Sequence, residues 1–265
     1  MNFKLAMVQM RVDGGRKEAN LTRAAGLVRQ AAEAGVKVAL FPEAMDLGWL
    51  HPSARNEAEM IPSGSSCCRL SELARIYGLF ICAGLTEKSG EKVFNSAVLI
   101  GPGGEVLIHH RKLNELSIGH DCYAEGDRLA VVGTPFGRIG VMICADAFAR
   151  GQIVTRTLGL MGAEIILSPS AWAVPSDHDN ERDPYGNLWT DNYGPVAREF
   201  GLWIAGCSNV GAISGGPWAG RKCIGSSLLV NADGEVACRG PYGVEAETIV
   251  YSEVTLSGRK RINYE

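Results

Sequence analysis

Three short apolar runs, each followed closely by a reactive side chain, constrain the fold of this chain more than any other feature. The runs are residues 38–41 before Glu43, residues 106–108 before Lys112, and residues 140–143 before Cys144. An apolar run without polar alternation is typical of a strand buried on both faces, as in a parallel sheet. We expect a carboxylate, an ammonium and a thiol to converge where these strands leave the sheet. Such a set can attack a carbonyl carbon, stabilise the developing charge and transfer protons.

Strand-like and helix-like segments alternate over much of the chain. The predicted strands are 3–10, 36–41, 79–85, 95–100, 105–110, 138–144, 164–168, 202–208, 226–231, 235–239 and 247–254, and the predicted helices are 20–34, 68–77, 150–162 and 190–200. This order, with its hairpins, indicates an α/β protein with a mixed sheet or paired sheets and helices outside. The polar stretch 172–187 predicts a long loop over a site or at an interface.

Length and composition favour one globular domain spanning residues 1–265. Apolar residues make up 46% of the chain and charged residues 21%, which suits a large core. The net charge of −3 gives no general attraction to nucleic acid or to an anionic membrane, and the basic triplet at 259–261 is small. No apolar run reaches the roughly 18 residues of a membrane helix, and no cleavable signal is evident, so we expect a cytoplasmic protein.

The eight cysteines show no Cys-x-x-Cys spacing, so we expect most of them to be reduced, buried apolar residues without a metal. Cys144 taken alone would also fit an inert core position, and Glu43 or Lys112 alone would fit a solvated charge. Their occurrence together, each after its own strand, is what favours a catalytic site.

With these motifs in place, the chain resembles the nitrilase superfamily of carbon–nitrogen hydrolases, in its amidase-like branch. The resemblance runs from Lys4 to about Glu253 and covers nearly the whole chain. The supporting segments are Phe41-Pro42-Glu43, Asn95-Ser96-Ala97, Arg111-Lys112, Gly126-Asp127, Gly140 to Asp146, Gly162-Ala163-Glu164, Pro169 to Trp172, and Gly225-Ser226-Ser227. The resemblance implies a four-layer α-β-β-α sandwich, a homodimer or higher homo-oligomer built through the helical faces, and no cofactor.

The resemblance also implies roles that the chemistry supports. Cys144 would be the nucleophile, and Glu43 would act as general base and acid. Lys112 would donate a hydrogen bond to the oxyanion, together with the backbone N–H of Ala145. The family often adds a second glutamate beside the lysine. Glu115 is the nearest candidate, with Asp121 and Glu125 as alternatives.

Two further segments bear on the substrate. Nitrilases typically carry Trp-Glu after the cysteine, whereas this chain has Ala145-Asp146, which favours an amide or carbamoyl substrate over a nitrile. Asp146 is also a suitable N-cap for the helix expected at 150–162. Ser170, Ala171 and Trp172 follow a strand just as Cys144 does and are expected to line the pocket, although Trp172 equally fits the core.

The sequence thus predicts a thiol-dependent hydrolase of a small amide or N-carbamoyl compound, acting through a cysteine thioester. Two alternatives remain open. One is a nitrilase that converts a nitrile to an acid, and the other is a catalytically silent binding or assembly module on the same fold. The substrate is not specified, because the loops 46–62, 114–130 and 172–190 shape the pocket.

Overall fold

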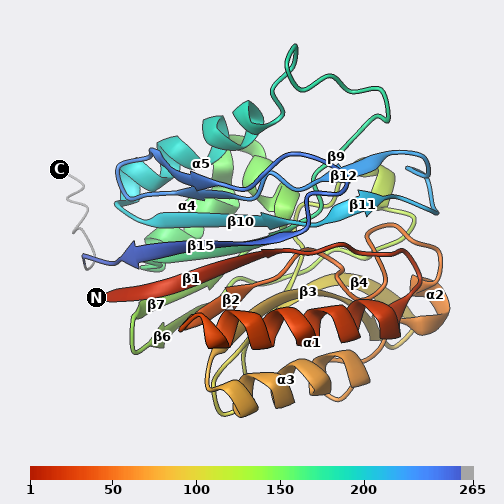
Figure 1. Cartoon of the computed structure of the whole chain (residues 1–265), viewed down its shortest axis with the longest axis horizontal. Helices are drawn as coiled ribbons and strands as arrows, with labels where there is room; N and C mark the ends of the chain where they lie inside the picture. The colour runs from red at the N-terminus through yellow and green to blue at the C-terminus, as the bar shows by residue number, and fades with distance from the viewer. Residues whose placement is uncertain (258–265) are drawn as a thin grey trace.

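The computed structural model describes residues 1–257, so the basic triplet at 259–261 lies outside the described residues. Two six-stranded mixed sheets form its centre (Figure 1). The first sheet runs in the order β15 (Thr248–Thr255), β1 (Asn2–Gln9), β2 (Val38–Leu40), β3 (Phe80–Ser89), β4 (Lys92–Ile100), β5 (Val106–Arg111). Its adjacent strands β1, β2 and β3 are parallel, and the strands at its edges are antiparallel.

The second sheet repeats this plan. Its order is β14 (Val236–Arg239), β13 (Leu228–Val230), β10 (Trp203–Ser208), β8 (Ile165–Ser170), β7 (Gly137–Val141), β6 (Val131–Thr134). Strands β7, β8 and β10 are parallel, and the others pair antiparallel. A small third sheet, which the sequence did not predict, joins β11 (Val210–Ala212), β12 (Lys222–Ile224) and β9 (Ala173–Val174).

Helices cover the outer face of each large sheet (Figure 1). The helices α1 (Lys17–Glu33) and α3 (Ser65–Tyr77) pack on the first sheet, and α4 (Ile153–Leu160) and α5 (Gly186–Phe200) pack on the second. The short helix α2 (Ala54–Glu57) and the 3-10 turns Ser117–Gly119, Cys144–Phe148 and Arg150–Gln152 lie in connections. The predicted four-layer α-β-β-α sandwich is confirmed.

Strand β1 shows why the chain forms layers. Leu5 and Met7 belong to the core between the sheets, whereas the alternate residues Ala6 and Val8 belong to the core under α1 and α3. Successive side chains of a strand point to opposite faces, so a strand covered on both faces must be apolar throughout. The continuous apolar runs in the sequence follow from this arrangement.

The boundaries on either side of Cys144 differ from the prediction in a way that bears on the site. The strand expected at 138–144 ends at Val141, and the helix expected at 150–162 is shortened to Ile153–Leu160. Gly151 and Gln152 have φ angles of 68° and 52°, and a left-handed backbone interrupts a right-handed helix. Residues 144–152 therefore form 3-10 turns between the strand and the helix.

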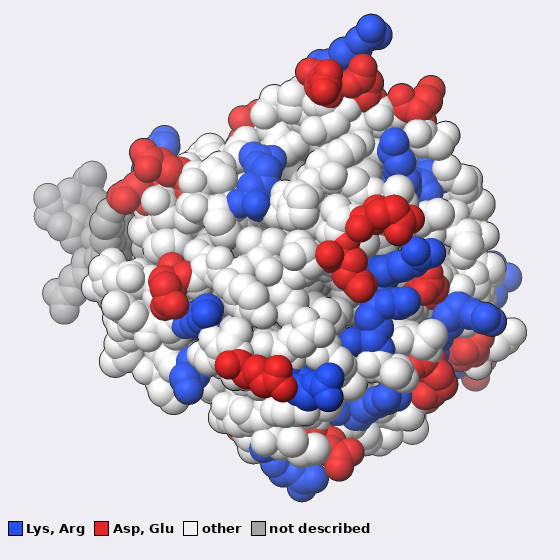
Figure 2. Space-filling view, in the orientation of Figure 1, with Lys and Arg blue, Asp and Glu red and all other residues white. Residues whose placement is uncertain are grey.

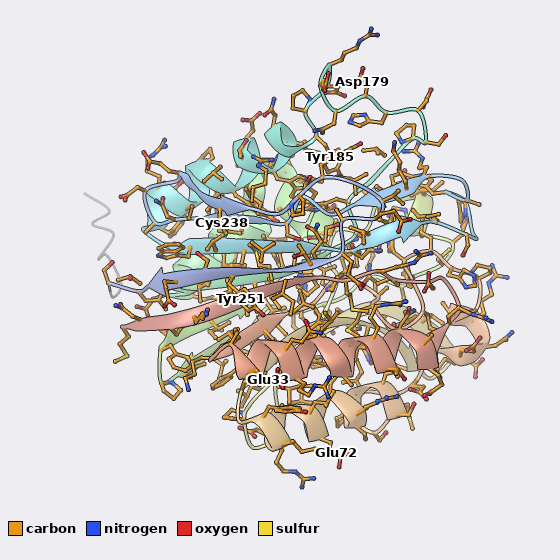
Figure 3. The ribbon with its side chains drawn as sticks, in the orientation of Figure 1. Glu33, Glu72, Asp179, Tyr185, Cys238 and Tyr251 are labelled. Carbon is orange, nitrogen blue, oxygen red and sulfur yellow. The ribbon has the colours of Figure 1, made fainter. Side chains whose placement is uncertain are left out.

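The polar stretch before α5 forms a loop, as predicted, apart from the short strand β9 at its start. It projects beyond the second sheet, with Asp179 near its tip and Tyr185 at its base (Figure 3). On the face drawn in Figure 2, basic and acidic side chains are interspersed, without an extended surface of one sign. Within residues 1–257, no helix is long and apolar enough to cross a membrane.

Candidate active site

The three reactive residues predicted from the sequence follow the ends of three strands. Glu43 follows β2, Lys112 follows β5 directly, and Cys144 follows β7. The first two come from one sheet and Cys144 comes from the other. All are buried, with 1% of Glu43, 2% of Lys112 and 8% of Cys144 exposed.

A buried hydrogen-bond network joins Lys112 to two carboxylates. Lys112 Nζ donates to Glu43 Oε1 at 2.7 Å and to Glu115 Oε1 at 3.0 Å. Asn95 Nδ2 bridges the same carboxylates, at 2.6 Å from Glu43 Oε1 and 3.0 Å from Glu115 Oε2. Glu115 is thus the second glutamate beside the lysine, whereas the alternatives Asp121 and Glu125 are exposed.

The second oxygen of Glu43 is in a different environment. Glu43 Oε2 is buried and has no hydrogen-bond partner among the described residues. A buried acceptor without a donor is costly, and such groups in native proteins often have a catalytic role. Oε2 is therefore the Glu43 atom available to accept a proton.

The position of Glu43 depends on a close approach of two backbones. Ala44 has a φ angle of 44°, which directs the chain sharply away after Glu43. The neighbouring strand β3 passes so near that a Cβ on Gly84 would lie 2.5 Å from Glu43 Cα. Gly84 N donates to Pro42 O at 3.0 Å, and Met45 N donates to Gly84 O at 2.9 Å. Only glycine fits at this position of β3.

Cys144 lies in a strained turn. Its φ angle of 42° is unusual for a residue with a side chain, and such strain clusters at functional sites. Its N–H donates to Ser168 Oγ at 3.2 Å, and the backbone N–H of Ala171 hydrogen-bonds to its sulfur. Ala145 follows in the first turn of the 3-10 helix, where N–H groups have no partner within the helix. Its N–H is therefore suited to an incoming oxygen.

Burial and charge set the protonation states. Burial, and then the negative charge of Glu43, raises the pKa of Cys144 well above its usual value, so the thiol is neutral at rest. Burial also raises the pKa of Glu43, although Lys112 opposes this effect. Burial disfavours the Lys112 ammonium, but the carboxylates of Glu43 and Glu115 outweigh it and raise the pKa of Lys112. The site therefore holds a charged lysine, a neutral thiol and a carboxylate suited to proton transfer.

The residues predicted to line the substrate pocket occupy different places. Ser170 is buried, and its carbonyl accepts the Glu43 N–H at 3.1 Å. Ala171 contacts the Cys144 sulfur through its N–H, as described above. Trp172 is 1% exposed, and its ring stacks on Trp189 at 4.4 Å. Trp172 thus packs in the core, and a contact between its ring and substrate stays a prediction.

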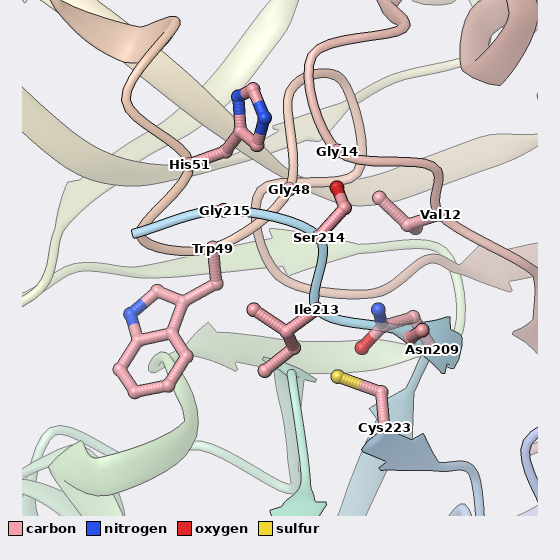
Figure 4. A pocket seen from close by; sticks show the side chains of 11 residues that line it. Val12, Gly14, Gly48, Trp49, His51, Asn209, Ile213, Ser214, Gly215 and Cys223 are labelled. Atoms are coloured by element: carbon pink, nitrogen blue, oxygen red, sulfur yellow. The ribbon is translucent and has the colours of Figure 1, made fainter. Parts of the chain in front are cut away.

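Trp49 contacts Lys112 and also lines a neighbouring pocket. Lys112 Nζ lies 5.5 Å from the centre of the Trp49 ring, within the range of a cation–π contact. Next to Trp49 is a small pocket that Trp49, His51, Asn209, Ile213 and Cys223 help to line (Figure 4). No Lys, Arg, Asp or Glu side chain is among its lining residues, and Cys144 does not reach it.

Sequence reasoning assigned no role to Asn95, although the segment Asn95-Ser96-Ala97 was part of the family pattern. Asp146 is not the N-cap of a helix, because α4 begins at Ile153 and the Asp146 carboxylate accepts hydrogen bonds from Ile143 N and His110 Nε2. Within the described part of the chain, no group of three or more His, Cys, Asp or Glu side chains is arranged to hold a metal ion.

Two facing mixed sheets between helices, with a carboxylate, an ammonium and a thiol at the strand ends, define a nitrilase-like α/β protein. The comparisons with known proteins identify its family. The family model described as carbon-nitrogen hydrolase matches residues 4–264, and the chain belongs to this family.

Curated relatives and solved structures agree with this membership. Omega-amidase NIT2 of Bos taurus is 28% identical over 96% of this chain and 89% of that relative. A protein named nitrilase from Pyrococcus abyssi (strain GE5 / Orsay) is 30% identical over 98% of this chain and 93% of that relative. The crystal structure of Nit3 from Saccharomyces cerevisiae, a member of branch 10 of the nitrilase superfamily, covers 96% of this chain and 90% of its own, at 22% identity and a TM-score of 0.81. An amidase structure from Nesterenkonia sp. gives 20% identity and a TM-score of 0.77, over 95% and 89% of the two chains.

Proposed function

We propose that the chain is a thiol-dependent amidase that hydrolyses the carbon–nitrogen bond of a small amide or N-carbamoyl compound. The observation that carries this proposal is the buried, unpartnered Glu43 Oε2. Its carboxylate is bound by Lys112, and its charge raises the pKa of the Cys144 thiol. A neutral thiol needs a base at the moment of attack, and this oxygen is suited to accept its proton.

In the proposed acylation, Glu43 Oε2 takes the proton of Cys144 as the sulfur attacks the carbonyl carbon. Negative charge then moves from the carboxylate to the substrate oxygen, which accepts hydrogen bonds from Lys112 Nζ and the Ala145 N–H. Glu43 returns the proton to the departing nitrogen, the carbon–nitrogen bond breaks, and a thioester remains on Cys144.

In the proposed deacylation, Glu43 takes a proton from a water molecule that attacks the thioester carbon. The carbon–sulfur bond breaks, the acid leaves, and the proton returns to the Cys144 sulfur. Glu115 and Asn95 hold Lys112 and Glu43 in place during both steps. A small amide substrate and a homo-oligomeric assembly are part of this proposal.

The second candidate is hydrolysis of a nitrile, because one relative carries the name nitrilase. The same sulfur would attack the nitrile carbon. Ala145-Asp146, in place of Trp-Glu, and the omega-amidase and amidase relatives favour the amide. A silent binding module would need none of Glu43, Lys112 and Cys144, so their joint burial argues against it.

The proposal is tested by incubating the protein with a mixed library of small amides, N-carbamoyl compounds and nitriles. We expect mass spectrometry to show an added acyl group on the peptide that contains Cys144, and the mass of that group identifies the substrate. Cys144→Ala is expected to fold and to lose turnover entirely. Turnover by a folded Cys144→Ala variant would disprove the proposal, and turnover of nitriles alone would select the second candidate.

A further inference from the structure

The Asp146 carboxylate accepts four hydrogen bonds in the fully buried interior. Its Oδ1 accepts the backbone N–H groups of Leu113 at 3.0 Å and Asn114 at 2.8 Å. Its Oδ2 accepts the N–H of Ile143 at 2.9 Å and a bond from His110 Nε2 at 2.8 Å. Asp146 is 0% exposed and His110 is 1% exposed.

These donors belong to the two segments that carry the reactive groups. Leu113 and Asn114 directly follow Lys112 and precede Glu115, whereas Ile143 directly precedes Cys144. A further bond joins the same segments, from Asn114 Nδ2 to Ala145 O at 2.6 Å. One carboxylate therefore connects the backbone beside the ammonium to the backbone beside the thiol.

His110 completes this connection from β5. Its Nε2 faces the Asp146 carboxylate, and its Nδ1 faces the carbonyl oxygen of Arg128 at 3.3 Å. Both neighbours are acceptors, and each ring nitrogen of His110 contacts one of them. The contact with His110 gives the buried Asp146 carboxylate a fourth hydrogen bond, and a buried polar group without partners would be costly.

We propose that Asp146, paired with His110, is a positioning residue that fixes the Lys112 segment against the Cys144 turn. The bond from Ile143 N to Asp146 Oδ2 also supports the turn in which Cys144 has its positive φ angle. The inference rests on the proposed roles of Lys112 and Cys144. The inference concerns what keeps Lys112 and Cys144 at a fixed distance from each other. Asp146 itself touches neither substrate nor the reacting atoms.

The first test compares the wild type with Asp146→Asn, which keeps the size of the side chain and removes its charge. The probe is iodoacetamide at neutral pH, with mass spectrometry of each cysteine peptide. The exposed Cys68 serves as the internal reference. Because small displacements in an active site are costly, we expect the Cys144-to-Cys68 alkylation ratio to fall at least about tenfold and kcat about 100-fold, with KM within about threefold.

The second test uses His110→Gln, which keeps a neutral donor and leaves the three backbone bonds to Asp146. We expect a smaller loss in the same direction. The double variant with Asp146→Asn should lose no more activity than Asp146→Asn alone, because both changes remove the same contact between His110 and Asp146. If the fold-losses of the two single variants multiply in the double variant, the pairing of His110 with Asp146 is overturned. If Asp146→Asn fails to fold, an unchanged alkylation ratio in His110→Gln overturns the inference.

Glu87→Gln on β3 is the matched control, because Glu87 contacts His109 and Arg111, the β5 residues that alternate with His110. Glu87 is also a buried carboxylate that faces a histidine, His109 Nε2 at 2.8 Å, and it contacts Arg111 as well. We expect this variant to be less stable but to keep the wild-type alkylation ratio and kcat. An equal loss in Glu87→Gln would show general destabilisation and overturn the inference, as would a folded Asp146→Asn variant within about twofold of wild type in both measurements.

Alkylation requires no substrate, so the two proposals fail separately. If the wild type hydrolyses no amide, N-carbamoyl compound or nitrile, the proposed function is wrong. The alkylation ratios still decide whether Asp146 positions the Cys144 turn.

Discussion

At the scale of single residues, the two oxygens of Glu43 have different roles in the proposed mechanism. Oε1 accepts hydrogen bonds from Lys112 and Asn95, which fix the carboxylate, and Oε2 stays without a partner among the described residues. One carboxylate is thereby both anchored and available to a proton. A carboxylate with both oxygens paired would hold its position but would be a poorer base.

This environment predicts the acid limb of the pH profile. Glu43 acts as a base only when deprotonated, and burial raises its pKa. The value of kcat/KM should therefore fall as the pH decreases through a point above the ordinary pKa of a glutamate, about 4.3. Glu43→Gln should lower kcat/KM by about 100-fold or more and remove this limb.

The measurement is kcat/KM for an accepted amide between acid and neutral pH. Glu125→Gln, at an exposed position, is the control and should keep the wild-type profile. A Glu43→Gln variant that retains the same acid limb would contradict the assignment of the base.

Trp49 gives a second prediction at this scale. Its ring faces Lys112 and also lines the pocket shown in Figure 4. Trp49→Leu should remove the cation–π contact with the Lys112 ammonium, worth about 0.5–2 kcal/mol. The smaller side chain should also open the site toward the pocket. We expect kcat/KM to fall for the smallest accepted amide and relative preference to shift toward larger acyl groups.

A series of amides with increasing acyl length measures this change. Trp218→Leu is the control, because Trp218 packs edge-on against Trp49 at 5.0 Å and leaves the Lys112 contact intact. If kcat/KM of Trp49→Leu ranks the amides in the same order as the wild type, the proposed role of Trp49 is contradicted.

Site residues that directly follow buried strands could be predicted from the sequence, whereas those in irregular segments could not. Glu43, Lys112 and Cys144 follow apolar strands, and the end of a buried strand determines where the next side chain emerges. Glu115 could not be separated from Asp121 and Glu125, because the segment after Lys112 has little regular structure and no repeat that fixes side-chain direction. The partners of Asp146 come from two segments far apart in the sequence, residues 110–114 and Ile143, which periodicity alone cannot bring together.

At the scale of elements, the close passage of β3 past Glu43 predicts the effect of a single added methyl group. A Cβ on Gly84 would meet the backbone of Glu43 and Ala44, which cannot move as a side-chain end can. Gly84→Ala should cost about 1–3 kcal/mol of stability and, by displacing Glu43, reduce kcat about 100-fold.

Gly26→Ala in α1 is the matched control, because a Cβ there meets nothing within 4 Å. Alanine favours a helix interior, so this variant should gain up to about 1 kcal/mol and keep its activity. Chemical denaturation and kcat for both variants check the pair. Full activity in Gly84→Ala would show that β3 can shift without displacing Glu43.

The elements themselves were predicted better than their ends. Strand β1 and helix α1 follow from clear periodicity, and each is observed within three residues of its expected start. The region after β7 was predicted poorly, because the apolar run continues through Met142 and Ile143 while the backbone already turns at Cys144. Local sequence does not show this turn, which the bonds of Asp146 and Ser168 hold in place.

At the scale of the whole molecule, α4 and α5 leave apolar side chains on the outer surface. Ile153 is 61% exposed and Leu188 is 46% exposed. The family resemblance predicts assembly through helical faces, and apolar groups on these helices suit such a contact. We expect sedimentation to show a dimer or larger assembly, and Ile153→Glu with Leu188→Glu to reduce it to a monomer.

Ile76→Glu is the control, because this residue lies on α3 over the other sheet and is 61% exposed. It should leave the mass of the assembly unchanged. A wild type that sediments as a monomer at all concentrations would contradict the expected homo-oligomer.

The order of helices and strands alone left open a single mixed sheet or two paired sheets, and only the family resemblance implied the paired sheets. The strands with continuous apolar runs need cover on both faces, and the four long helices can cover only one face of each sheet. The remaining faces are apolar, as Leu5 on β1 and Leu167 on β8 show, and they bury each other. Pairing the sheets is therefore the arrangement that removes both inner faces from water.

The division of the reactive groups between the two sheets has a consequence during synthesis. A growing polypeptide that has completed only its amino-terminal half carries the base and the ammonium but lacks the sulfur that they serve. Until the two sheets pack together, Cys144 has neither Glu43 nor Lys112 beside it. Under the proposed mechanism, the thiol therefore gains its base and its oxyanion donor only in the finished sandwich.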